Sequence, residues 1–150
     1  MNNTWDLLEK FINEFPSIKC KNVNIKDIAE AERNLCLHFS DSYKFFLKNY
    51  ECSIAGELRI YGLSKAESFS NDLWSVIQNT NFFKEQEKWP DIEDWYIVST
   101  DGSGDPIGIN AKGEVWISYH DSGFEQEKLA DSFEEFLYKL LTETLWTDED

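Results

Sequence analysis

The chain has 150 residues, of which 14 are lysine or arginine and 29 are aspartate or glutamate, so its formal net charge at pH 7 is −15. This charge excludes a direct binder of duplex DNA or RNA, because such proteins present a basic surface to the phosphates. It also argues against adhesion to an anionic membrane. Six tryptophans, six tyrosines and eleven phenylalanines exclude the composition of a disordered chain. We therefore expect one compact domain with its core over residues 4–146 and an acidic tail at 147–150.

The first residues lack the pattern of an export signal. Acids arrive at Asp6 and Glu9, where a signal peptide would have a basic start and then an apolar stretch. No apolar run approaches the length of a membrane-spanning helix. We expect a cytoplasmic protein.

The cysteines favour reduced thiols. Cys20, Cys36 and Cys52 are an odd set with no CxxC pair. With His38 and His120 as the only histidines, a zinc site is not expected. Cys36 is interpreted as a small buried thiol and His38 as a loop residue, so their closeness in sequence does not predict a catalytic pair.

Apolar residues at three- and four-residue spacings predict three amphipathic helices in the first third of the chain, over 4–15, 25–35 and 41–50. Pro16 marks the end of the first helix. The residues expected to cap the three N-termini are Thr4, Asn24 and Ser40.

Strands follow from residue 58. β-Branched and aromatic residues predict strands over 58–61, 95–99, 106–109 and 115–120, with reversals at 101–105 and 110–113 between the last three. The intervening stretch 64–88 is ambiguous. Leu73, Trp74, Val76 and Ile77 suggest a helix there, while Phe82, Phe83, Trp89 and Pro90 suggest a covering loop.

A last helix is expected to begin at an Asp131 cap and to bury Phe133, Phe136, Leu137, Leu140 and Leu141. Helices first, strands second and a terminal helix last is an α+β order. The predicted fold is a mostly antiparallel sheet of about 4–6 strands, with the N-terminal helices and the C-terminal helix packed on it.

Motifs for catalysis and metal binding are weak in this chain. The glycines of 102–108 miss the spacing of a dinucleotide loop and precede a strand, so we interpret them as a tight turn. Asp101, Ser103 and Asp105 resemble the opening of a calcium loop, which then needs glycine and glutamate where this chain has Pro106 and Lys112. We expect no metal and no cofactor.

Catalytic alternatives rest on few residues. The paired acids in 85–94 and 134–135 are typical of solvated surface, and the chain has no G-x-S-x-G motif. His120, at a strand end beside Asp121, is the one candidate general base. A small hydrolase using Asp101, Asp105 or His120 therefore stays open as the least favoured hypothesis, and our prediction is that the chain is not an enzyme.

Four segments, taken together, carry a resemblance. They are Ser99–His120 with its Gly-Asp turn between strands, Leu129–Leu137 with Ser-Phe-x-x-Phe-Leu, and the helix pair Ile28–Leu35 and Asp41–Tyr50. Their order and spacing resemble the SUKH superfamily, the SMI/KNR-type proteins, over about residues 4–142.

The resemblance implies a binding function. Bacterial SUKH members are commonly immunity proteins that neutralise a cognate toxin domain, often a nuclease, and other members are regulatory interaction proteins. By that resemblance we expect an immunity protein, active as a monomer or weak dimer, that occludes a basic toxin domain. A regulatory scaffold for an endogenous partner remains the alternative. The acidic composition agrees with a basic protein partner.

The candidate contact residues are acids at strand ends and two aromatic residues. Trp116 and Tyr119 point to opposite faces of their strand, so the core must claim at least one of them. The residues expected to bind the partner are Glu57, Asp101, Asp105, Trp116, Tyr119, Asp121 and Glu125.

Overall fold

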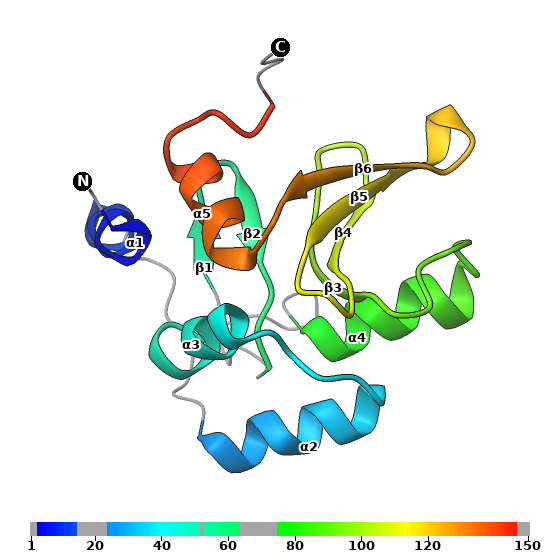
Figure 1. The fold of residues 1–150 in the computed structure, drawn as a ribbon, viewed down its shortest axis with the longest axis horizontal. Helices are drawn as coiled ribbons and strands as arrows, with labels where there is room; N and C mark the ends of the chain where they lie inside the picture. The colour runs from blue at the N-terminus through cyan, green and yellow to red at the C-terminus, as the bar shows by residue number, and fades with distance from the viewer. Residues whose placement is uncertain (1–2, 15–23, 52, 64–74, 147–150) are drawn as a thin grey trace.

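The structure is a computed structural model that describes residues 3–14, 24–51, 53–63 and 75–146. Helices come first, strands dominate the middle, and a helix is the last regular element of the described chain (Figure 1). In chain order the elements are α1 (Thr4–Glu14), α2 (Ile25–Leu35), α3 (Asp41–Asn49), β1 (Ser53–Ala55), β2 (Leu58–Ile60), α4 (Val76–Asn81), the π-helical turn η1 (Phe82–Gln86), β3 (Tyr96–Thr100), β4 (Pro106–Ile109), β5 (Val115–Tyr119), the 3₁₀ turn η2 (His120–Ser122), β6 (Glu125–Ala130) and α5 (Phe133–Leu141).

Polar caps set the N-termini of the first three helices. The Asn24 side chain accepts the Asp27 N–H, and the Asp27 side chain accepts the Asn24 N–H, so α2 begins with the expected cap in a reciprocal capping box. Ser40 caps α3 as predicted. The cap of α1 is one residue earlier than expected, because Asn3 Oδ1 accepts the Trp5 N–H at 2.8 Å and Thr4 is already helical.

The fold is α+β, as predicted, with its strands divided between two antiparallel sheets. β1 and β2 form a hairpin, and the other strands form a sheet in the order β3-β4-β5-β6. The hairpin is fastened to β3 by the Tyr61 N–H, which donates to the Val98 carbonyl at 2.9 Å, and by Ser99 Oγ, which donates to the Arg59 carbonyl at 2.6 Å.

Three features differ from the expectation. The strand β6 was missed because its sequence, EQEKLA, is charged: it lies at the sheet edge, where charged side chains are tolerated. The short β1 was also missed. Phe82 and Phe83 belong to the η1 turn that extends α4, so the covering-loop interpretation was wrong for them.

Aromatic rings join α3, α5 and β3 in the core. The Phe133 ring centroid lies 5.1 Å from that of Tyr43 and 5.4 Å from that of Phe46. Tyr96 of β3 lies 5.4 Å from Tyr43. Four residues of the predicted inner face of α5 are buried as expected, namely Phe133, Phe136, Leu137 and Leu140. Leu141, which was also expected to be buried, is only half-buried.

The cap of α5 is Ser132, so the prediction of Asp131 was wrong by one residue. Ser132 Oγ accepts the Glu135 N–H at 3.1 Å. The Asp131 carboxylate instead lies 2.8 Å from the Lys128 ammonium of β6. Asp131 and Ser132 are both residue types that favour caps, so the sequence pattern alone does not distinguish them.

Several expectations lie outside the described residues. They are the thiols of Cys20 and Cys52, the helical interpretation of Leu73 and Trp74, and the acidic tail 147–150. Cys36 is described and is exposed, so the expectation of a buried thiol was wrong. Within the described ranges, every helix is too short or too polar to span a membrane.

Candidate functional site

The connections that carry the candidate acids lie at one end of the sheets. Figure 1 shows the β1–β2 turn, the β3–β4 turn and the loop after β5 along the upper side of the fold, where the C-terminal segment also lies. A hollow of about 330 Å³ joins three of these segments to the end of β5. Its lining includes Glu57, Asp101 and Tyr119, so three of the predicted contact residues meet although they are distant in sequence. The full lining is Glu57, Leu58, Asp101, Gly102, Tyr119 and Trp146.

Asp101 builds the turn between β3 and β4. Its Oδ1 accepts the Ser103 N–H at 3.0 Å and the Asp105 N–H at 2.9 Å, as an aspartate at the start of a turn commonly does. Gly104 has φ of +83°, a conformation that favours glycine. The Asp101 side chain therefore fixes the shape of one wall of the hollow.

Asp105 is buried and holds the next connection in place. Its carboxylate accepts the His120 N–H at 3.1 Å and also contacts His120 Nδ1. Asp105 was predicted to contact the partner, and this prediction needs correction, because only 3% of Asp105 is exposed. Its carboxylate accepts a backbone N–H from η2 and so supports the surface from beneath.

His120 is held between two carboxylates. Its Nε2 lies 3.1 Å from Asp121 Oδ1, on the opposite side of the ring from the Asp105 contact at Nδ1. The hydrogen bond to Asp105, then the charges of Asp105, Asp121 and Asp101, raise the pKa of the imidazole above its ordinary value. Protonated, the ring donates to both acids and offers no lone pair to accept a proton from a substrate.

Tyr119 lies in the same negative field. Its hydroxyl donates to Glu127 Oε1 at 2.8 Å. Burial raises the pKa of this phenol, and the bond to Glu127 and the charges of Glu127, Asp101 and Asp105 raise it further. These carboxylates thus converge on the end of β5. We call the carboxylates that line this end of the sheets the acidic rim: Glu57, Asp101, Asp121, Glu125 and Glu127.

Trp116 does not belong to this end. It is paired across the sheet with Lys128, and its indole N–H donates to Glu114 Oε1 at 3.2 Å. Glu125, a member of the acidic rim, is paired with Tyr119. Trp116 and Tyr119 are both partly buried against the core, so the core takes a share of each ring and fully buries neither.

Two exposed aromatic residues beside the rim were not predicted. Phe124 is 41% exposed, has φ of +66°, and packs edge-on against Trp89 with ring centroids 5.1 Å apart. Trp146 is 44% exposed, and its indole N–H donates to Glu57 Oε1 at 2.8 Å across 89 residues of sequence. Neither residue belongs to a periodic apolar pattern, so only the position of Phe124 next to Gly123, a turn residue, could have drawn attention to it.

The contribution of His120 to stability should decline as pH rises. Folding raises its pKa, so the protonated ring favours the folded state. The contribution is complete below the ordinary value of 6.5 and is lost as pH passes the raised value. Urea unfolding of the wild type and His120→Gln at about pH 6 and about pH 9 should show a larger difference in unfolding free energy at the lower pH. A difference that does not change with pH would contradict this assignment.

Among the described residues, no three histidine, cysteine, aspartate or glutamate side chains lie close enough together to hold a metal ion. The acidic rim is therefore a surface of separate carboxylates, each engaged with backbone, tyrosine, histidine or tryptophan groups or directed to solvent.

The fold and the segments noted in the sequence agree with a comparison against protein families. The family SUKH_5, described as SMI1-KNR4 cell-wall, matches residues 1–142. The chain belongs to this SUKH family. A search of curated proteins found no match. In this SUKH chain the matched span contains most of the acidic end, including Asp101, Asp105 and Asp121, and ends just before the segment that carries Trp146.

Proposed function

We propose that this SUKH protein is an immunity protein that binds a basic, nuclease-type toxin domain in the cytoplasm and occludes its active site. The observation that carries the proposal is the acidic rim, which is placed beside two exposed aromatic side chains, Trp146 and Phe124. Immunity proteins are common among bacterial SUKH members, so membership of the family also supports an immunity function.

Charge and aromatic groups have different tasks in such a complex. A domain that cuts nucleic acid needs a basic face for the phosphates, and a rim of carboxylates is complementary to it. Complementary charge speeds encounter. Affinity comes mainly from a few well-packed anchors, among which tryptophan is frequent. Trp146 is partly exposed and held at one position by Glu57, so it is a suitable anchor.

We propose that the protein acts without catalysis, as a monomer or weak dimer. His120 is the one candidate base, and both of its ring nitrogens contact carboxylates. The contacts among Asp105, His120 and Asp121 are better suited to a structural role than to catalysis, because they hold the loop after β5 against the β3–β4 turn.

A regulatory scaffold that binds an endogenous partner is the second candidate. The family description, SMI1-KNR4 cell-wall, favours it. The same rim could bind a basic regulatory partner, so the two candidates differ in the partner and not in the surface.

The test is neutralisation. The chain should restore growth when it is co-expressed with a toxin domain encoded immediately upstream of its own gene, and the two purified proteins should form a stable complex. Growth arrest that the chain does not relieve, together with no complex, would overturn the immunity function. Recovery of an endogenous partner from the native cell would then identify the scaffold instead.

A further inference from the structure

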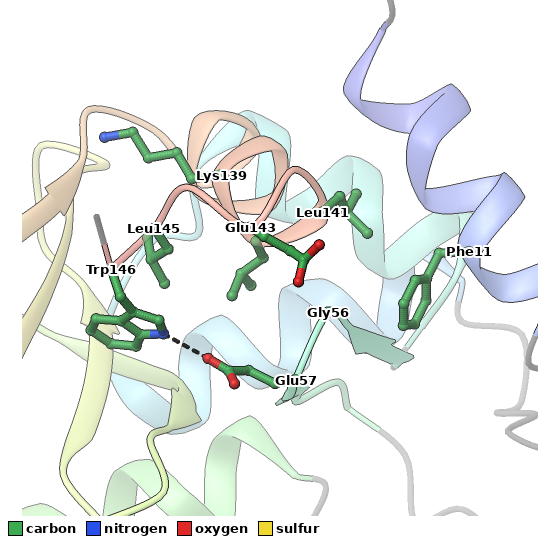
Figure 2. A pocket seen from close by; sticks show the side chains of 9 residues that line it. Phe11, Gly56, Glu57, Lys139, Leu141, Glu143, Leu145 and Trp146 are labelled. Atoms are coloured by element: carbon green, nitrogen blue, oxygen red, sulfur yellow. Dashed lines mark hydrogen bonds between the residues drawn. The ribbon is translucent and has the colours of Figure 1, made fainter. Parts of the chain in front are cut away.

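A second, larger hollow shares Glu57 and Trp146 with the first. This groove of about 640 Å³ lies between α1, the β1–β2 turn and the end of α5 (Figure 2). Its apolar lining comes from Phe11, Leu140, Leu141 and Leu145. The turn reaches α5 closely at Gly56, where a Cβ atom would lie 2.7 Å from the Leu140 carbonyl oxygen. The volume of the groove falls within the range of about 300–1,000 Å³ found for ligand pockets.

The groove carries two carboxylates against its apolar lining. Figure 2 shows the Glu143 carboxylate extending into the groove and the Glu57 carboxylate reaching the Trp146 indole. Lys139 also borders the groove, but its ammonium donates to the Leu129 carbonyl at 2.9 Å. Figure 2 shows this ammonium directed away from the Glu57 and Glu143 carboxylates, so the lysine forms no ion pair with either of them.

One wall of the groove comes from beyond the span that matches the family. The match ends at residue 142, and Glu143, Leu145 and Trp146 follow it. The Glu143 N–H donates to the Leu140 carbonyl and the Thr144 N–H to the Lys139 carbonyl, which is the hydrogen bonding of a Schellman motif. Glu143 has φ of +58°, at the position where glycine is usual. A glutamate there is strained, yet it delivers a carboxylate to the groove.

We propose that this groove receives an arginine or lysine side chain presented on an apolar segment of the partner protein. The cation would lie beside the Trp146 indole, the best aromatic partner for a positive charge. It would donate to the carboxylates of Glu57 and Glu143 in charge-assisted hydrogen bonds. Arginine suits the site best, because its five N–H groups can serve two carboxylates together. The leucines would cover the methylene stem and the apolar neighbours.

This inference rests on the proposed function for its partner, but its chemistry can be tested with a peptide. The probe is acetyl-Leu-Arg-Leu-amide, and its matched control replaces arginine with citrulline, which has nearly the same shape and no charge. In the full-length ¹⁵N-labelled protein, the indole N–H resonance of Trp146 is assigned from a Trp146→Phe variant. The arginine peptide should shift this resonance to saturation, with an affinity at least about tenfold higher than that of the citrulline peptide.

Two variants separate binding from folding. Glu57→Gln removes a charge and keeps an oxygen that can accept the Trp146 N–H. Glu143→Gly removes the other carboxylate and relieves the strained φ, so its unfolding free energy should equal or exceed that of the wild type. Each should weaken binding of the arginine peptide about tenfold. Glu134→Gln, which removes a charge from the exposed face of α5, is the matched control and should bind as the wild type does.

The outcomes are distinct. Equal affinity for the two peptides, or unchanged affinity in both groove variants, would overturn the inference. Failure of the arginine peptide while the chain still neutralises a toxin would reject the groove and leave the proposed function in place. Binding of the arginine peptide by a chain that neutralises no toxin would support the groove and reject the proposed immunity function.

Discussion

Reversing Asp121 and Glu125 together to lysine should slow association with a basic toxin domain by at least about tenfold at low salt. Both residues are exposed and belong to the acidic rim. Oppositely charged proteins associate at about 10⁸–10⁹ M⁻¹s⁻¹ at low salt, against about 10⁵–10⁶ M⁻¹s⁻¹ without such attraction. Stopped-flow measurement of the association rate against ionic strength provides the test. The association rates of the wild type and the lysine variant should become equal at high salt, because salt screens the attraction that only the wild type retains.

A matched control distinguishes local charge from net charge. Glu30→Lys with Glu134→Lys changes the net charge equally, at exposed positions on α2 and α5 away from the rim. This control should retain most of the association rate, and toxin-exposed cells should be protected by it and not by the rim variant. Equal association rates and equal protection for the wild type and the rim variant would remove Asp121 and Glu125 from the interface. The helical face would then be the next surface to test.

The fold could be predicted where local residue preferences agree with the tertiary packing. The strands β3, β4 and β5 are rich in β-branched and aromatic residues, and all are present near the expected positions. The edge strand β6 contradicts its local preference, because pairing with β5 and not its own composition makes it a strand. The cap of α5 was misplaced by one residue, because Asp131 and Ser132 are both good cap residues and only the folded backbone places Ser132 Oγ at the Glu135 N–H.

The sequence predicted about half of the residues that line the hollow. Turns and strand ends indicated Glu57, Asp101 and Tyr119, and the structure brings these together around one hollow. Trp146 was missed because its place depends on a contact with Glu57, far away in sequence. The burial of Asp105 could not be read from its turn either, since the partner that accounts for it is His120, beyond the next two strands.

Truncating Phe133 or Phe136 to alanine should cost about 3–5 kcal/mol of unfolding free energy, the usual range for a fully buried phenylalanine. Both side chains are 0% exposed, and the Phe133 ring packs against Tyr43 and Phe46 of α3 as well as Phe136 of its own helix. The cavity would open where α3, α5 and β3 meet, and rings held by several partners cannot collapse into it easily. Tyr138→Ala on the same helix is the matched control. Its ring is 42% exposed, so we expect a loss of less than about 1 kcal/mol in the same urea titration. Similar small losses for all three variants would mean that α5 does not pack on the sheet. The β1–β2 turn and the Trp146 segment, both positioned by α5, would then lose their support.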